Sequence, residues 1–217
     1  MVAAALPTVL VTGFDAFGGD TLNPSWLIAQ ALHGRRIAGH RVVAAQLPTV
    51  FGDSLGALCQ LLRGHRPALV LCLGQAGGRG AISLERVAIN IDDARIADNA
   101  QAQPVDTPVV AGAPTAYFTR LPVKAMLLAL QQAGIAAEVS QTAGTFVCNH
   151  VFYGLMHELA TRRGFKQVRG GFVHVPWLPA QGQPSMPLEQ MVQGIALALK
   201  TALTTRADAV QAAGALH

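Results

Sequence analysis

Short apolar runs alternate along most of the chain with segments whose apolar residues recur at helical spacing. The apolar runs predict strands over residues 8–12, 41–47, 68–73, 137–140 and 170–175. The helically spaced segments predict helices over residues 25–32, 51–63, 123–133, 148–163 and 188–204. An alternation of strands and helices of this kind is typical of an α/β protein.

The most apolar of these runs, residues 68–73, indicates how the strands are packed. It has no polar position, which is typical of a strand covered on both faces and therefore of a parallel sheet. The prediction is a three-layer α/β/α sandwich with a mostly parallel central sheet, forming a single catalytic domain over residues 1–217. Residues 97–115 are expected to form a long surface loop or an oligomer contact, and the chain from about 207 a frayed tail.

The segment from Glu85 to Ile91 departs from this alternation. Period-two spacing places Glu85 on the same face as Val87, Ile89 and Ile91, where a carboxylate is costly without a partner. The segment is predicted to form a hairpin or an antiparallel addition to the sheet. The alternative is a register break or an edge strand that turns Glu85 toward solvent.

Cys148 lies at the junction between an extended run and a helix, after the turn at Gly144 and Thr145. Unpaired N–H groups and the positive end of the helix dipole favour an anion there, so the pKa of the thiol is expected to fall toward neutrality. A thiolate of this kind attacks carbonyl carbons. The alternative is a small buried apolar residue, the commonest role of a free cysteine.

His174 stands in a buried-looking strand that Pro176 stops. A lone histidine in such a strand is more often a core residue whose polar atoms are satisfied. Together with Cys148 and Glu85, however, it completes the set that acyl transfer needs, namely a nucleophile, a general base and a group that orients the base.

Other histidines and glycines give weaker signals. His150 is a rival base, but residues two apart on a helix do not face one another, and His150 and His157 are too far apart for paired metal ligation at adjacent turns. The loop from Gly13 to Gly18 lacks the spacing of a dinucleotide site. Neither a metal nor a cofactor is therefore expected.

The composition agrees with a soluble enzyme. Hydrophobic residues make up 51% of the chain and charged residues only 13%, which favours a large core or a buried subunit interface. No apolar run can span a bilayer and no signal peptide is evident, so a cytoplasmic location is expected. The formal charge is +4, but the arginines occur in separate pairs, and nucleic-acid binding is not expected.

The chain also resembles the pyroglutamyl peptidase type I (pyrrolidone carboxyl peptidase) family in blocks that run in family order across nearly its whole length. The matching blocks are residues 11–19 (VTGFDAFGG), 23–26 (NPSW), 74–79 (GQAGGR), 85–90 (ERVAIN), 92–96 (DDARI), 142–150 (TAGTFVCNH) and 172–176 (FVHVP). One departure is Ala16, where many members have proline; the change is expected to loosen that loop.

The resemblance implies a cofactor-free cysteine exopeptidase that removes N-terminal pyroglutamate from peptides and assembles as a homotetramer. It implies Cys148 as nucleophile, His174 as base and Glu85 as orienter, with Arg95 and the backbone N–H of Cys148 at the oxyanion. The residues that it implies for the lactam pocket are Phe14, Phe17, Thr49, Gln75, Ile96, Phe146 and Val147. Two alternatives from other classes are a non-catalytic binding module that has kept the pocket and a nucleoside phosphorylase, for which no phosphate site is evident.

Overall fold

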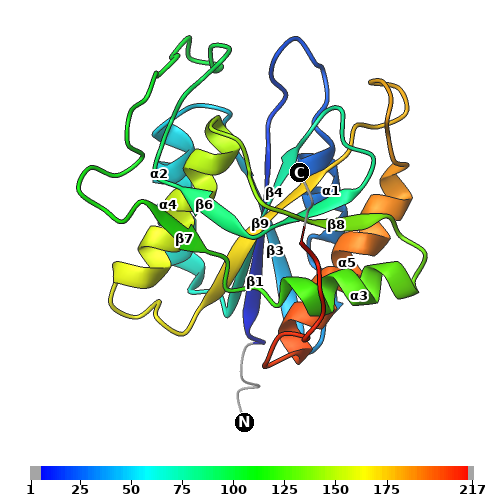
Figure 1. The fold of residues 1–217 in the computed structure, drawn as a ribbon. Coiled ribbons are helices and arrows are strands. Elements are labelled where there is room, and N and C mark those ends of the chain that lie inside the picture. Colours follow the sequence, from blue (N-terminus) through cyan, green and yellow to red (C-terminus); the bar gives the residue numbers. More distant parts are fainter. Residues whose placement is uncertain (1–5, 215–217) are drawn as a thin grey trace.

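A seven-stranded sheet runs through the centre of the computed structural model, which describes residues 6–214 (Figure 1). Its strands in chain order are β1 (Thr8–Phe14), β2 (Arg36–Ile37), β3 (His40–Leu47), β4 (Leu69–Gln75), β5 (Ile82–Glu85), β8 (Ala137–Ser140) and β9 (Arg169–Val175). Their order across the sheet is β2-β3-β1-β4-β9-β5-β8. A second sheet pairs β6 (Val87–Ile89) with β7 (Ala116–Phe118).

Most neighbouring strands are parallel, as the apolar runs predicted. β1 is parallel to β3 and β4, β4 is parallel to β9, and β5 is parallel to β8. Two pairs are antiparallel: β2 with β3, and β5 with β9. The second of these pairs brings the carboxyl end of β5 beside β9, which matters for the site.

Helices cover both faces of the sheet. They are α1 (Pro24–Leu32), α2 (Asp53–His65), α3 (Val123–Gln132), α4 (Val147–Thr161) and α5 (Leu188–Thr204). Figure 1 shows α2 and α4 on one face, with the small sheet beside them, and α1, α3 and α5 on the other. Two apolar cores follow from this layering, one under each set of helices. The predicted α/β/α sandwich is therefore confirmed.

The five predicted strands and five predicted helices all occur, with ends that move by at most a few residues. α1 begins one residue early because the Asn23 side chain accepts a hydrogen bond from the backbone N–H of Ser25 and Pro24 occupies the first turn. The short strands β2, β5, β6 and β7 were not predicted as separate elements.

The segment from Glu85 to Ile91 does pair in antiparallel fashion, β5 with β9 and β6 with β7, but the placement of Glu85 on one face with Val87, Ile89 and Ile91 was wrong. β5 ends at Glu85, Arg86 belongs to no strand, and β6 begins at Val87 in the other sheet. The register therefore breaks at Arg86. Glu85 nevertheless points inward and is fully buried, because its partners lie on β9 and in the loop after β4.

Residues 97–115 form neither a helix nor a strand, as expected of a long loop. The segment after Thr204 is also irregular, but it is tied to the fold at Asp208. Its carboxylate accepts hydrogen bonds from the backbone N–H groups of Lys124 and Ala125, which lie in the first turn of α3 and lack a side-chain cap of their own. Within residues 6–214, none of the helices is long and apolar enough to cross a membrane.

Candidate active site

The thiol of Cys148, at the start of α4, and the imidazole of His174, on β9, lie over one face of the sheet. Gly74 is the Cα partner of His174, and paired residues of neighbouring strands project to the same face. A Cβ built on Gly74 would lie 2.7 Å from Cys148 Sγ, so the thiol fills the space that a side chain at 74 would occupy. Cys148 and His174 therefore lie over the same face, close to the carboxyl ends of β4 and β9.

Glu85 lies against the imidazole of His174. The two residues are 89 positions apart in the chain, and the antiparallel pairing of β5 with β9 makes them diagonal neighbours. His174 Nδ1 lies 2.7 Å from Glu85 Oε1, and both side chains are buried. Because the carboxylate accepts, the Nδ1 atom carries the proton, and Nε2 is left as the basic atom of the ring.

Arg79 is a functional candidate whose role the sequence did not reveal. Its Nη1 atom donates to Glu85 Oε1 at 2.8 Å, and its Nη2 atom donates to the carbonyl oxygen of Thr142 at 3.2 Å. The guanidinium thus neutralises a buried carboxylate and links it to the turn that precedes Cys148. Arg79 stands in a glycine-rich segment after the carboxyl end of β4, and its position beside predicted site residues was the available signal.

Cys148 is the second residue of α4, as predicted within one residue, and its thiol is partly buried. A backbone N–H in the first turn has no acceptor within its own helix, so the N–H of Cys148 is available to an oxyanion. The expected fall in the pKa of the thiol does not occur. Burial, followed by the Glu85 carboxylate, raises the pKa of Cys148 to about 12, and the opposing effect of Arg79 is smaller.

The stabilisation of a thiolate by the amino-terminal end of α4 is too small to lower the pKa of Cys148. A helix end contributes about 0.3–1 kcal/mol to a nearby charge, less than the cost of burying an anion. In the free protein the thiol of Cys148 is therefore neutral.

His150 is not placed to take a proton from Cys148, the rival role considered for it. Its Nδ1 atom lies 2.8 Å from Asp92 Oδ2, and its Nε2 atom accepts a hydrogen bond from the backbone N–H of Gly52 at 3.1 Å. Both nitrogens are occupied, so His150 holds the start of α2 in place. Asn149 has a similar role, since its side chain binds the backbone of Ile89 and Ile91.

Three phenylalanine rings lie together beside the start of α4. The ring centroids of Phe17 and Phe146 are 6.0 Å apart, and those of Phe51 and Phe146 are 5.4 Å apart. Phe51 was not predicted, although it follows the carboxyl end of β3 in the same way that Phe17 follows β1. Of the other predicted pocket residues, Phe14 and Val147 are buried in the core beneath α2 and α4.

The polar pocket candidates are bound to other side chains. The Thr49 hydroxyl donates to Asp15 Oδ1 at 2.6 Å. Gln75 donates from Nε2 to Asp20 Oδ2 at 2.9 Å and accepts at Oε1 from Gln181 at 3.1 Å. These bonds order the loops that follow β1, β3 and β9, and they supply hydrogen-bond donors to both Asp15 and Asp20.

Arg95 and Ile96 are exposed. Among the described residues the Arg95 side chain makes no hydrogen bond or ion pair, so the structure does not join it to Cys148. The segment before it is nevertheless fixed beside the start of α4. The backbone N–H of Asp93 donates to the carbonyl oxygen of Thr145 at 3.0 Å, and the Thr145 hydroxyl donates to the carbonyl oxygen of Asp93 at 2.6 Å.

No group of three or more His, Cys, Asp or Glu side chains within residues 6–214 is arranged to hold a metal ion. The site thus consists of a thiol, an imidazole, a carboxylate and an arginine at the carboxyl edge of an open α/β sheet. This fold and these groups are typical of hydrolases that use a cysteine nucleophile.

Comparison with known proteins gives the family. The chain belongs to the pyroglutamyl peptidase family, whose profile matches residues 7–205. It is 57% identical over 217 residues to pyrrolidone-carboxylate peptidase of Cupriavidus taiwanensis, a match that spans 98% of this chain and 100% of that protein.

Solved structures agree with this assignment. Pyroglutamyl peptidase I from Bacillus amyloliquefaciens is 43% identical, with a TM-score of 0.92, over 96% of this chain and 100% of that chain. Pyrrolidone carboxyl peptidase from Thermococcus litoralis is 36% identical, with a TM-score of 0.88, over 91% of this chain and 94% of that chain. The family resemblance and the class of enzyme predicted from the sequence are confirmed.

Proposed function

We propose that the protein hydrolyses the bond between an N-terminal pyroglutamyl residue and the rest of a peptide, with Cys148 as nucleophile. The observation that carries this proposal is the Glu85–His174 pair, 2.7 Å apart, on the sheet face that Cys148 Sγ occupies. Family membership supports the substrate class.

In the proposed mechanism His174 Nε2 takes the thiol proton as Cys148 Sγ bonds to the substrate carbonyl carbon. The raised pKa of Cys148 favours this coupling, because a neutral thiol is a poor nucleophile until its proton leaves. The backbone N–H of Cys148, and Arg95 if it turns inward, donate to the developing oxyanion.

His174 then gives its proton to the leaving amine as the C–N bond breaks, which leaves a thioester on Cys148. A water molecule attacks the thioester carbonyl while His174 removes a proton from it. That proton returns to the sulfur as pyroglutamate leaves. Glu85, held by Arg79, keeps the imidazole in one tautomer throughout.

Specificity follows from charge. Pyroglutamate is a flat neutral lactam, and the rings of Phe17, Phe51 and Phe146 offer an apolar surface for it. A prolyl or glutaminyl terminus would bring an ammonium group to the same surface. Glu85, Asp15 and Asp20 are already bound to side-chain donors, so they offer that ammonium little compensation for its desolvation.

The test is release of aminomethylcoumarin from pyroglutamyl, prolyl and glutaminyl derivatives. We expect kcat/KM to favour the pyroglutamyl compound at least about a thousandfold, the factor that about 4 kcal/mol of discrimination gives. Cys148→Ala should lose about three or more orders of magnitude, whereas the matched variant Cys59→Ala should retain near-normal turnover. Comparable rates on the prolyl compound would indicate a broader aminopeptidase, and binding without release would indicate a binding module.

Three further points belong to this proposal. The chain acts as one catalytic domain over residues 1–217, in the cytoplasm, as a homotetramer. The exposed apolar side chains of Val105 and Phe118, 64% and 70% accessible, support burial against other subunits. Native mass spectrometry tests the tetramer, and a monomeric mass at micromolar concentration would refute it.

A further inference from the structure

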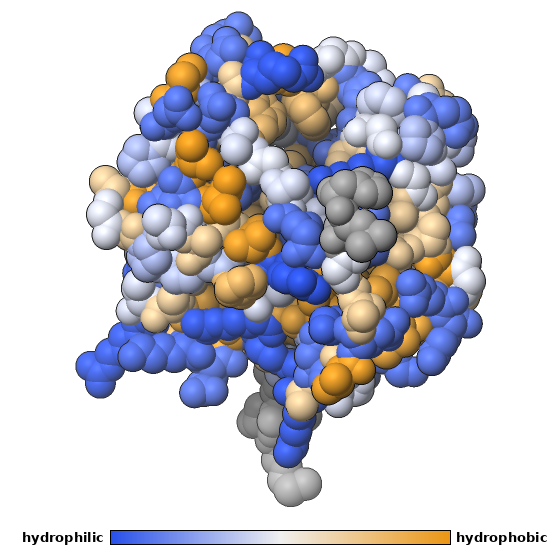
Figure 2. All heavy atoms as spheres, in the orientation of Figure 1, coloured by the Kyte–Doolittle hydropathy of each residue, from blue (hydrophilic) through white to orange (hydrophobic). Residues whose placement is uncertain are grey.

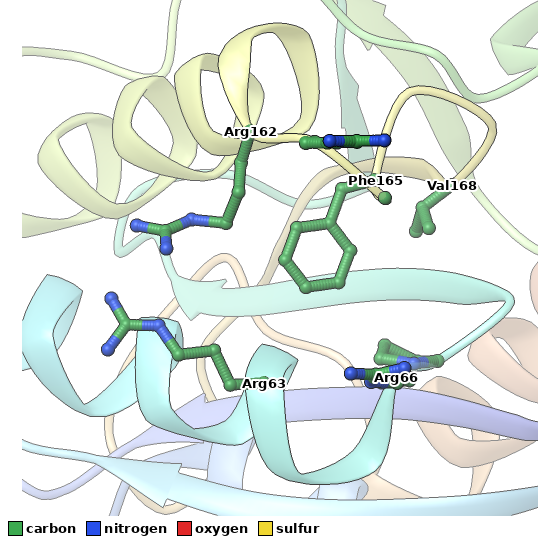
Figure 3. A pocket seen from close by; sticks show the side chains of 8 residues that line it. Arg63, Arg66, Arg162, Phe165 and Val168 are labelled. Atoms are coloured by element: carbon green, nitrogen blue, oxygen red, sulfur yellow. The ribbon is translucent and has the colours of Figure 1, made fainter.

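A cavity of about 310 Å³ lies at the end of the sheet opposite the candidate active site. Its lining comes from the end of α2, the end of α4 and the two segments that lead into β4 and β9. The active-site residues gather at the carboxyl ends of those same strands, so the two sites are at opposite edges. Figure 3 shows the cavity between the two helices, with Phe165 inside it.

Four arginines line this cavity: Arg63, Arg66, Arg162 and Arg163. They come from two chain segments about a hundred residues apart, which is why the sequence alone indicated only scattered arginine pairs. Figure 3 shows the side chains of Arg63 and Arg162, one from each helix end, extending to the same side of the view, away from Phe165 and Arg66. Arg162 is already paired with Glu158, so the charge that remains for a bound anion is that of Arg63, Arg66 and Arg163.

Little of this charge is neutralised by the protein. Arg162 forms an ion pair with Glu158. The side chains of Arg63, Arg66 and Arg163 make no hydrogen bond or ion pair with any residue from 6 to 214. Arginines near the carboxyl ends of α2 and α4 interact favourably with the negative ends of the helix dipoles, but each end carries only about half an elementary charge. The surplus charge exceeds what the two helix ends require.

Arg66 has an unusual backbone conformation. Arg66 closes α2 with φ at +43°, in the left-handed region where glycine is preferred, and its side chain lines the cavity. A non-glycine residue there is strained by about 1–2 kcal/mol.

We propose that this cavity binds a compact polyphosphate. Guanidinium groups bind phosphate oxygens through paired, charge-assisted hydrogen bonds, and three arginines without partners match the charge of a tri- or tetra-anion. The Phe165 ring offers an apolar surface, so a nucleoside triphosphate and inorganic tripolyphosphate are the two possible sources of this chemistry. The cavity is at the lower end of the size range of ligand pockets, which suits a small anion.

The surface beside the cavity is also basic, so a long polyanion such as a nucleic acid is the alternative ligand. Arg120, Lys166 and Arg206 line a neighbouring hollow that shares Val168 with the cavity. Figure 2 shows hydrophilic residues along the lower part of the molecule, where the connection from α4 to β9 lies in Figure 1. A nucleic acid would use this whole surface, whereas a compact polyphosphate would use the cavity alone.

Isothermal titration calorimetry of the full chain at low ionic strength tests the proposal, with inorganic tripolyphosphate, ATP and adenosine as ligands. We expect saturable binding of tripolyphosphate and none of adenosine. Tighter binding of ATP than of tripolyphosphate would identify the nucleotide as the source, and equal or weaker binding the inorganic anion. Arg63→Gln/Arg66→Gln should weaken binding at least about tenfold through loss of charge-assisted bonds. The matched variant Arg35→Gln/Arg36→Gln removes the same charge from an exposed pair elsewhere and should change it less than about twofold.

Arg66→Gly separates binding from folding. It should leave the thermal midpoint without ligand unchanged or higher, since glycine suits the left-handed backbone, yet weaken tripolyphosphate binding. The proposal is overturned if wild type shows no saturable binding, or if both double variants lose affinity equally. It is also overturned if an oligonucleotide binds more tightly than tripolyphosphate and Lys166→Gln/Arg206→Gln abolishes that binding.

Discussion

Arg79 and His174 both donate a hydrogen bond to the same carboxylate oxygen of Glu85, Oε1. Arg79 Nη1 lies 2.8 Å from this oxygen and His174 Nδ1 lies 2.7 Å from it. The other oxygen, Oε2, is buried without a partner among the described residues. A single atom of Glu85 thus connects the imidazole of His174 to a cation, and the orientation of that imidazole depends on the cation as well as on the carboxylate.

Arg79→Gln should therefore lower kcat about ten- to a hundredfold with little change in KM, because it acts on the orientation of the base and not on substrate contacts. Arg79→Lys should recover part of the loss. The matched control is Arg86→Gln, which removes the same charge one residue after Glu85 and should have little effect. Equal effects of the two glutamine variants would show that Arg79 acts only through long-range charge.

The two histidines near Cys148 should behave differently on substitution. His174→Ala removes proton transfer and should cost about 10³-fold or more in kcat, while Glu85→Gln keeps a hydrogen-bonding group and should retain more activity. His150→Ala should be the mildest of the three and should mainly lower stability, because its ring binds Asp92 and the backbone of Gly52. An indispensable His150 with a dispensable His174 in the pH–rate profiles would reverse the assignment.

Much of this arrangement was predictable from the sequence, because it depends on local pattern. The strand before Cys148, the helix after it and the strand that carries His174 all follow from apolar spacing. The contact between Glu85 and Arg79 cannot be predicted from apolar spacing. It depends on the antiparallel approach of β5 to β9 and on the break at Arg86, and both are set by tertiary packing.

The pKa of Cys148 and the four-arginine cavity were not predictable for the same reason. Burial of the thiol overrides the local effect of the helix end. The cavity joins Arg63 and Arg66 to Arg162 and Arg163 only after α2 and α4 have packed together.

The reactivity of Cys148 in the free protein should follow its raised pKa. With a pKa of about 12, the thiolate fraction grows about tenfold for each pH unit well below that value, so alkylation by iodoacetamide should keep accelerating from pH 6 to pH 9. Peptide mapping at each pH assigns the rate to Cys148. A plateau reached near pH 7 would mean that the resting site holds a thiolate, in contradiction to the effect of burial.

Cys72, buried inside β4, should make stability fall at alkaline pH. Burial raises the pKa of this thiol from its ordinary value of 9.0 to about 12, so above pH 9 the unfolded chain loses a proton that the folded chain keeps. Stability is then lost between about pH 9 and 12, at up to about 1.4 kcal/mol per pH unit.

Urea unfolding of wild type and Cys72→Ala at pH 8 and pH 10 measures this effect. The alanine variant leaves a cavity and should be less stable at pH 8, but the deficit should shrink by about 1.4 kcal/mol at pH 10 because it has no thiol to titrate at that position. A deficit that is the same at both pH values would show that the Cys72 thiol does not resist ionisation in the folded state.

The central claim is that Cys148 attacks a carbonyl carbon held by a site for the neutral lactam. The most direct measurement is covalent labelling of the wild-type protein with pyroglutamyl chloromethyl ketone, followed by peptide mapping, with the prolyl chloromethyl ketone as the matched control. We predict alkylation at Cys148, at a rate at least about a thousandfold above that of the prolyl reagent, and loss of labelling in Cys148→Ala. Labelling at another residue, or equal rates with the two reagents, would contradict the account.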